Sequence, residues 1–234
     1  MIEALTSGAL WGALGAIIVA NILLSGDNAV VIAMAARSLP PQQQKKAIYF
    51  GSAAAIVMRI VLTIVAVQML QVPYLKIVGA LALLWIGAQL LVETEEEGEI
   101  REVGSLAAAI RTILIADLVM SIDNVIAVAA AASRAPELYR LTLLIVGLAT
   151  SIPLIIIGST LLMKIMDRFP IIITLGAALL GFLAGDMLVS DPVLDAWFKA
   201  NLPHADLIFG VGGAILVVAI GKWLHHRGQR MEAA

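Results

Sequence analysis

Long apolar stretches limit what this chain can fold into more than any other feature of its sequence. A transmembrane helix needs about 20 mostly apolar residues to cross the bilayer. Seven stretches reach that length, and short breakers such as Pro40-Pro41 and Asp191-Pro192 separate most of them. They cover residues 9–36, 47–70, 74–92, 106–132, 138–163, 170–189 and 207–224. We therefore expect an all-α polytopic membrane protein with seven transmembrane helices.

The composition agrees with lipid as the solvent for much of the surface. Hydrophobic residues make up 61% of the 234 residues and charged residues only 14%, whereas soluble domains carry about 45–50% and about 25%. The chain has no cysteine, which excludes disulfides and thiolate metal sites. A net charge of −2 and basic residues spread over short connections exclude a nucleic-acid-binding surface.

Lys and Arg are divided unevenly between the two sides of the predicted helices. Four lie on one side: Lys76, Arg134, Arg140 and Lys199. Ten lie on the other: Arg37, Lys45, Lys46, Arg101, Arg111, Lys164, Arg168, Lys222, Arg227 and Arg230. Basic connections stay in the cytoplasm. We therefore expect a multi-pass protein of the cell (plasma) membrane, with its N-terminus outside and its C-terminus in the cytoplasm.

An internal repeat divides the sequence into two halves. Residues 20–28 read ANILLSGDN and residues 116–124 read ADLVMSIDN, at an offset of 96 residues. They contain the only two Asp-Asn dipeptides of the chain. Each half holds three predicted helices, and an odd number places the halves in opposite orientations. Such inverted repeats are typical of secondary transporters, whose sites lie near the bilayer midplane.

The repeat predicts four parts of the chain. They are a first three-helix repeat (1–92), an acidic cytoplasmic linker (93–105), a second three-helix repeat (106–190) and a C-terminal part (191–234). The C-terminal part holds a connecting loop, one helix outside the repeat and a basic tail. Gly210, Gly212 and Gly213 of that helix suit close packing against a neighbour, either in this chain or in another subunit of a homo-oligomer.

Four aspartates lie inside predicted helices: Asp27, Asp117, Asp123 and Asp186. A carboxylate at the bilayer centre costs about 2.5–3.5 kcal/mol, so such residues usually face an interior or mark a pathway. At 100° per residue, Asp117, Ser121 and Asn124 share one face of their helix. The matching face in the first half carries Asn21, Ser25 and Asn28.

We expect a break at Gly26, because irregular backbone is tolerated at membrane depth where it lines a cavity. The two Ser-x-Asp-Asn turns, approached from opposite sides, would then form one site. Residues 150–153, with Pro153, predict a kink in the fifth helix. Arg59 is interpreted as a structural counter-ion, and Asp186 either completes the site or pairs with Arg59.

The polar groups of the predicted helices offer oxygen ligands, which favour Mg²⁺, Ca²⁺ or Mn²⁺ over softer metals. With four ionised carboxylates, a divalent cation and Arg59 would offset three charges, so we expect one proton to stay bound in some states. The alternative is that these groups form interhelical hydrogen bonds that hold a bundle together.

The two motif segments resemble the TerC family of integral membrane proteins. The resemblance is carried by NILLSGDNAVVIAMAARSLP (21–40) and ADLVMSIDNVIAVAAAA (116–132), and it covers nearly the whole chain. It implies metal homeostasis, especially Mn²⁺ efflux. By motif position it implies a ligand set of Asp27, Asn28, Asp117, Asp123, Asn124 and Asp186. Asn21 stands where the second half has Asp117, so the halves would not ligate the metal symmetrically.

We therefore expect a divalent-cation transporter that exports Mn²⁺ by alternating access. Proton exchange is the expected energy source, because the sequence has no P-loop. We expect no enzyme and no prosthetic cofactor, with the lipid bilayer and the transported metal ion as partners. Two alternatives stay open. One is a transporter of another small solute that uses the aspartates as proton relays, and the other is a non-transporting membrane partner that delivers metal to exported proteins.

Overall fold

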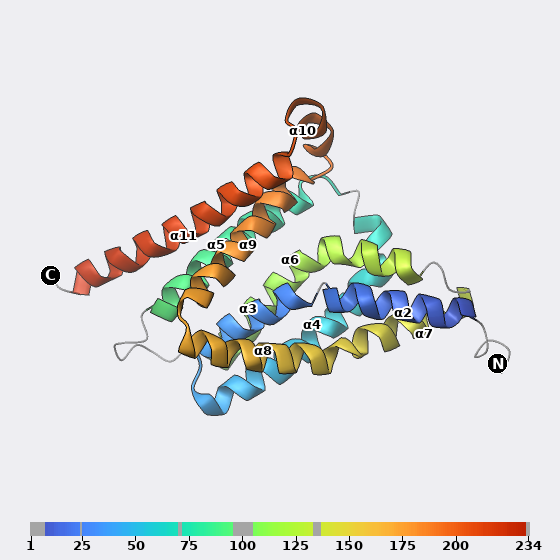
Figure 1. The fold of residues 1–234 in the computed structure, drawn as a ribbon, viewed down its shortest axis with the longest axis horizontal. Coiled ribbons are helices and arrows are strands. Elements are labelled where there is room, and N and C mark those ends of the chain that lie inside the picture. Colours follow the sequence, from blue (N-terminus) through green and yellow to red (C-terminus); the bar gives the residue numbers. More distant parts are fainter. Residues whose placement is uncertain (1–7, 24, 70–71, 96–104, 133–136, 233–234) are drawn as a thin grey trace.

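The computed structural model describes residues 8–23, 25–69, 72–95, 105–132 and 137–232 (Figure 1). In these ranges the chain forms helices and no strand, so the predicted all-α fold is confirmed there. The helices are α2 (Gly8–Leu23), α3 (Gly26–Arg37), α4 (Pro41–Met69), α5 (Leu75–Glu95), α6 (Leu106–Ala132), α7 (Glu137–Ala149), α8 (Ser151–Arg168), α9 (Ile171–Val189), α10 (Asp195–Asn201) and α11 (Ala205–Glu232).

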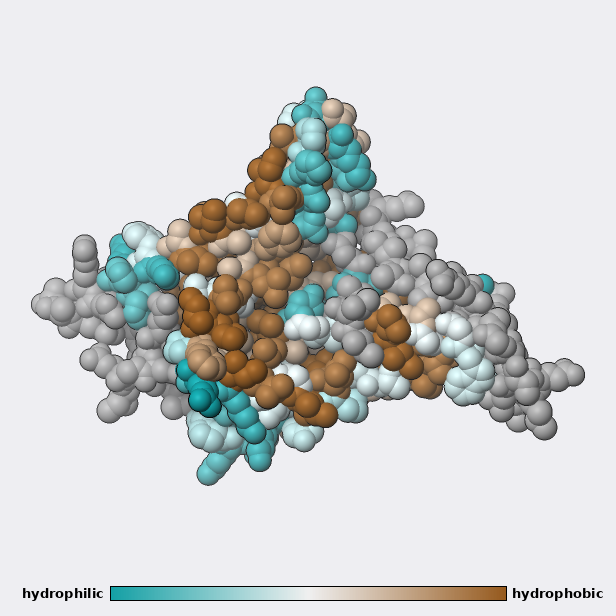
Figure 2. Space-filling view, in the orientation of Figure 1, coloured by the Kyte–Doolittle hydropathy of each residue, from teal (hydrophilic) through white to brown (hydrophobic). Residues whose placement is uncertain are grey.

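The outer surface of the protein is suited to lipid. Large apolar side chains such as Trp85 (68% exposed), Ile157 (65%) and Ile215 (64%) point outwards. Figure 2 shows apolar residues across the middle of the visible face, with hydrophilic residues at α10 and near the end of α8. Five described stretches are long and apolar enough to cross a membrane: Pro41–Ile64, Leu75–Val92, Tyr139–Arg168, Ile171–Val189 and Ala205–Arg227. The protein is therefore a multi-pass membrane protein, while the predicted total of seven spans stays a prediction.

The described helices pack in two groups. α5, α9 and α11 lie side by side along one flank of the molecule, and α2, α3, α4, α6, α7 and α8 form a bundle next to them (Figure 1). Within the bundle, α4 packs along α6, while α3 packs along α8 and α2 along α7. One hydrophobic core joins the groups, because it contains Met34 of α3, Ile113 of α6 and Leu180 of α9.

The first predicted helix is interrupted next to Gly26. α2 ends at Leu23 and α3 begins at Gly26, so the predicted break is confirmed. The second Ser-x-Asp-Asn motif behaves differently, because α6 runs without interruption from Leu106 to Ala132. The prediction of a second turn there is wrong. Ile122 occupies the place of Gly26 in the repeat and is a buried core residue, so its packing favours the regular helix.

The fifth predicted helix is divided as its proline indicates. α7 ends at Ala149 and α8 begins at Ser151, with Pro153 in the first turn of α8. The Thr150 hydroxyl donates to the Gly147 carbonyl and the Ser151 hydroxyl to the Leu148 carbonyl, each at 2.6 Å. These hydroxyls therefore satisfy carbonyl groups at the interruption.

The loop after α9 holds the beginning of α5. Asp191 is completely buried, and its carboxylate accepts hydrogen bonds from the backbone N–H groups of Tyr74 (3.3 Å), Ile77 (3.3 Å) and Val193 (3.0 Å). Tyr74 has a left-handed φ of 66°, a conformation that a non-glycine residue keeps only where its surroundings impose it. The sequence indicated only a breaker here, and α10 was not predicted.

Several helix boundaries differ from those predicted, and two differ the most. α4 begins at Pro41 rather than at residue 47. Pro suits the first helical position, because the N–H group that it lacks would have no partner there. α11 extends to Glu232 rather than ending at residue 224.

The glycines of α11 pack against α9 of the same chain. A Cβ added at Gly210 would lie 2.6 Å from the Phe182 ring, and one at Gly213 would collide with the Gly181 carbonyl. A Cβ at Gly212 would meet nothing within 4 Å. The predicted close packing is therefore confirmed inside the chain.

Candidate functional site

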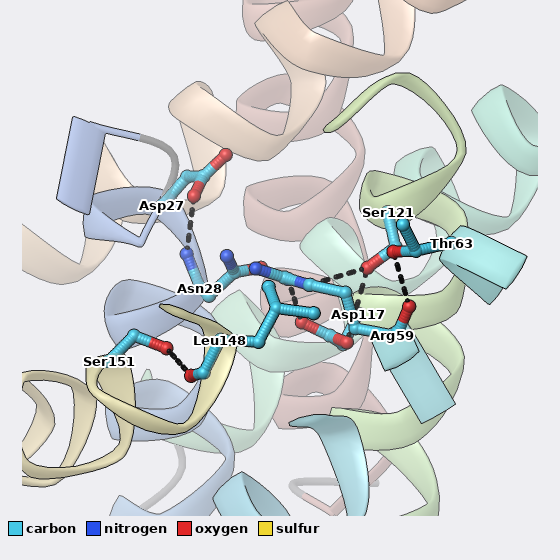
Figure 3. A network of polar contacts seen from close by, with 8 residues as sticks. All are labelled: Asp27, Asn28, Arg59, Thr63, Asp117, Ser121, Leu148 and Ser151. Carbon is cyan, nitrogen blue, oxygen red and sulfur yellow. Dashed lines mark hydrogen bonds and ion pairs between the residues drawn. The ribbon is translucent and has the colours of Figure 1, made fainter. Parts of the chain in front are cut away.

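A buried ion pair joins α4 to α6 (Figure 3). Arg59 Nη2 lies 2.5 Å from Asp117 Oδ1, and Arg59 Nε donates to Ser121 Oγ at 3.0 Å. Ser121 Oγ donates in turn to Asp117 Oδ2 at 3.3 Å. Arg59 is 2% exposed and Asp117 5%. Groups of the protein therefore bind both carboxylate oxygens of Asp117.

Helical periodicity explains how the two helices supply this cluster. Asp117 and Ser121 are four residues apart on α6 and share a face, as the sequence predicted. Arg59 and Thr63 have the same spacing on α4, and the Thr63 hydroxyl donates to the Arg59 carbonyl at 2.7 Å. Two polar faces thus meet where α4 packs along α6, and each charge has a partner of opposite sign. Such pairing is what makes a buried charge tolerable.

The beginning of α3 brings Asp27 and Asn28 next to this ion pair. Asp27 Oδ1 accepts the backbone N–H of Asn28 at 2.8 Å. In Figure 3 the Asp27 carboxylate lies beyond Asn28 as seen from Arg59, and the charges of both Arg59 and Asp117 act on it. The free N–H groups at a helix N-terminus favour a negative charge. The break at Gly26 therefore has a consequence for the site, because it places a helix N-terminus and a carboxylate beside the ion pair.

Asn124 extends the polar face of α6 by one turn beyond Ser121. Its side chain is buried, and its Nδ2 has no hydrogen-bond partner among the described residues. A buried polar atom without a partner costs about 1–3 kcal/mol. Among the described residues, the NH₂ group of Asn124 is therefore a hydrogen-bond donor without an acceptor.

The structure brings together half of the predicted metal ligands. Asp27, Asn28 and Asp117 surround Arg59, and Asn124 lies on the same helix face as Asp117. Asp123 belongs to α6, but its side chain lies outside the described residues, as does that of Asn21 in α2.

Asp186 lies in the other group of helices. It is half-buried on α9, next to Gly185, which packs on Phe209 of α11, and Met187, which packs on Gly79 of α5. The network in Figure 3 does not include it. Arg59 makes its ion pair with Asp117, so the proposed pairing of Arg59 with Asp186 is wrong.

The side chains that the structure describes do not form a ready-made metal site. No group of three or more His, Cys, Asp or Glu side chains among them is close enough to hold an ion. A cation that binds next to Asp117 would therefore need a rearrangement of Arg59, or ligands from outside the described set. The predicted six-residue metal site stays a prediction.

Sequence reasoning found most of this cluster but missed one member. Arg59 was interpreted as a structural counter-ion; its pairing with Asp117 confirms the ion pair, while the purely structural role stays a prediction. Ser121 was expected on the polar face of its helix. Thr63 was missed, although its position one helical turn after the only charged residue in that predicted span could have indicated it.

Comparisons with known proteins agree with the resemblance of the motifs. A family model described as "Integral membrane protein TerC family" matches residues 6–229. The chain is 44% identical over 181 residues to the uncharacterized membrane protein YjbE of Bacillus subtilis (strain 168), an alignment that covers 77% of this chain and 81% of YjbE. It is 25% identical over 240 residues to the uncharacterized membrane protein YceF of the same organism, covering 98% of this chain and 89% of YceF. No solved structure matches this chain.

Proposed function

Because the chain belongs to the TerC family of integral membrane proteins, we propose that it is a transporter of divalent metal cations, with Mn²⁺ export as the favoured activity. The family and the apolar surface support transport across a membrane. The choice of a divalent cation rests on the chemistry of the buried side chains, and the choice of Mn²⁺ rests on what the family resemblance implies.

One observation carries the proposal: the buried Arg59–Asp117 ion pair connects the two repeats. Arg59 belongs to the first repeat (1–92) and Asp117 to the second (106–190). Ionisable residues inside a membrane usually mark the pathway of an ion or a proton. If the two halves move against each other during alternating access, this contact has to change, and an ion bound there would be exposed to each side in turn.

The packing pattern supports an inverted relation between the halves. In the repeat, α2 with α3 corresponds to α6, α4 corresponds to α7 with α8, and α5 corresponds to α9. α4 packs along α6. The elements that correspond to this pair also pack along each other, because α8 lies along α3 and α7 lies along α2. α5 packs against its own counterpart, α9. A two-fold axis in the membrane plane would produce this exchange of partners.

The charges of the cluster suit a divalent cation. Asp27 and Asp117 contribute two negative charges when ionised and Arg59 one positive charge. Asp123, which we add to the site from the motif alone, would leave two negative charges for the cation to neutralise. Carboxylate, carboxamide and hydroxyl oxygens are the ligands that such hard cations prefer. Asp186 would add one more negative charge, which a proton could offset.

The test is Mn²⁺ flux into or out of liposomes that contain the purified protein and a trapped Mn²⁺-sensitive dye. We expect flux with the wild type and a loss of at least about tenfold with Asp117→Asn, equivalent to about 1.4 kcal/mol. Asp195→Asn is the matched control, because it makes the same chemical change at an exposed Asp195–Lys199 pair on α10. Absence of wild-type flux, in correctly inserted protein with and without a pH gradient, would contradict the proposal.

A second candidate is a transporter of another small solute, with the aspartates as proton relays. It is favoured by the fact that Arg59 compensates the charge of Asp117. The same liposomes distinguish the two, because this candidate predicts proton movement that neither needs Mn²⁺ nor is changed by it. If neither Mn²⁺ nor protons move, we would favour the third reading, a non-transporting protein that delivers metal to a partner.

A further inference from the structure

We propose that Arg59 is a tethered substitute for the transported cation. In this proposal, which rests on the proposed function, the Arg59 guanidinium occupies Asp117 while the carrier is empty and leaves it when a divalent cation binds. Arg59 therefore has a step of its own in the cycle, namely the return of the empty carrier. This differs from a counter-ion that only holds the bundle together.

The contacts of Asp117 make its two partners mutually exclusive. Its Oδ1 is bound by Arg59 Nη2 and its Oδ2 by the Ser121 hydroxyl. Ser121 also accepts a hydrogen bond from Arg59 Nε, so the guanidinium spans both residues. A divalent cation coordinated by Asp117 would lie against a group of like charge. The cation and the guanidinium therefore compete for the same carboxylate.

Burial explains why an empty carrier needs such a substitute. Asp117 and Arg59 are almost completely buried, and a buried charge that loses its partner of opposite charge is strongly destabilising. After release of the cation, the empty carrier changes back from one open state, outward or inward, to the other. Without Arg59, the Asp117 carboxylate would have no positive charge beside it during this change. With Arg59 in place, the empty site keeps a neutral pair across the interface of the two halves.

The backbone of Arg59 and its guanidinium are held by different groups. The Thr63 hydroxyl donates to the backbone carbonyl of Arg59, so the backbone stays fixed on α4. The side chain beyond it is a flexible stem that can move its charged end. In the proposed step the side chain of Arg59 rotates away from Asp117 and the neighbouring side chains rearrange to make room, while the Arg59 backbone stays in α4.

Competition with Arg59 would also make binding at Asp117 favour divalent over monovalent cations. A monovalent cation that displaces the guanidinium exchanges one positive charge for another and gains no electrostatic stabilisation. A divalent cation adds one net positive charge to a site that holds further carboxylates, among them Asp27. The transported class is thus set partly by the charge of the residue that it displaces.

Arg59→Gln separates the two steps of the cycle. In liposomes with Mn²⁺ on both sides, exchange never requires an empty carrier to return, whereas net efflux into Mn²⁺-free buffer does. At pH 8 we expect Arg59→Gln to reduce net efflux at least about tenfold, which is about 1.4 kcal/mol, while exchange changes less than about twofold. The Mn²⁺ concentration for half-maximal exchange should fall, because the competitor is gone. Arg59→Lys keeps the charge and should restore net efflux.

Arg37→Gln is the matched control, since it removes another Arg–Asp pair, Arg37 with Asp167, from the ends of α3 and α8. It should change net efflux and exchange by the same factor. Two outcomes would overturn the proposal. One is net efflux at the wild-type level in Arg59→Gln, and the other is an equal fall of net efflux and exchange that Arg59→Lys does not reverse. If Arg59→Gln does not insert into the membrane, Arg59→Lys is the test. Lysine cannot form the two contacts that the guanidinium makes with Asp117 and Ser121, so the Mn²⁺ concentration for half-maximal exchange should be lower than in the wild type. Absence of any flux in the wild type would instead refute the proposed function.

Discussion

Arg59 and Asp191 are stabilised inside the protein in two different ways. Arg59 has a side-chain partner of opposite charge, Asp117, and that partner belongs to another helix, in the other predicted repeat. Asp191 has backbone partners instead, and two of its three N–H donors belong to the first residues of α5 or the turn before it. A side-chain pair can be exchanged for another cation. Fixed backbone donors cannot move away, so we assign Asp191 to stability and Arg59 to the transport cycle.

Asp191→Asn should therefore destabilise the protein without involving the ion pair. The asparagine NH₂ group cannot accept a hydrogen bond, so at least one of the N–H groups of Tyr74, Ile77 and Val193 loses its partner. We expect a loss of about 1–3 kcal/mol, the usual cost of an unsatisfied buried donor, measured as a lower midpoint of thermal unfolding in detergent. Asp195→Asn, at an exposed pair, should change the midpoint much less. Equal midpoints for both variants would contradict this role of Asp191.

Single residues also mark the limit of prediction from this sequence. The period of 100° was enough to place Asp117 and Ser121 on one face of their helix. It did not indicate which carboxylate Arg59 would contact, because that depends on how α4 packs along α6. Asp191 was missed for the same reason: two of its three donors, Tyr74 and Ile77, are more than 100 residues away in sequence.

At the scale of helices, local signals predicted the interruptions where a residue cannot support a regular helix. Gly26 and Pro153 each mark a real break, whereas the repeat alone wrongly suggested one at Ile122. The repeat preserved the Asp-Asn dipeptide but not the glycine before it. α10 has only seven residues and packs through Phe198 against Phe209 of α11. The local sequence does not predict this tertiary contact.

The contact between α9 and α11 gives a prediction for a pair of adjacent residues. Gly213→Ala would place a methyl group against the Gly181 carbonyl and within 3.3 Å of Gly185 N, both of which are backbone atoms. We expect a loss of about 1–3 kcal/mol from overpacking. Gly212→Ala meets nothing within 4 Å and should be neutral or slightly stabilising, because Ala favours helices. Thermal unfolding of the two variants in the same detergent measures the difference. A Gly213→Ala protein as stable as Gly212→Ala would show that α11 does not pack on α9 as closely as described.

At the scale of the whole molecule, the proposed cycle requires the two repeats to move against each other. α3 of the first repeat and α8 of the second are in direct contact, and a Cβ added at Gly158 would lie 3.5 Å from the Ala29 Cβ. That separation is within the range of about 3.5–4.5 Å found in disulfides. Because the chain has no cysteine of its own, a pair introduced at these positions meets no native thiol with which it could form another disulfide.

The Ala29→Cys, Gly158→Cys variant should therefore transport Mn²⁺ when reduced and lose transport when oxidised. The control is Leu91→Cys, Gly221→Cys, which joins α5 to α11 but does not connect the two predicted repeats. Its built Cβ–Cβ distance of 3.2 Å is slightly below the disulfide range, so the two helices have to separate by a few tenths of an ångström to form the bond. It should transport in both redox states, and the single-cysteine variants exclude a direct effect of the oxidant. Full transport by the oxidised α3–α8 variant, with the cross-link verified by mass spectrometry, would mean that α3 and α8 stay together throughout the cycle. Movement would then have to occur between other elements, and the rearrangement of the Arg59–Asp117 pair would have to be local to α4 and α6.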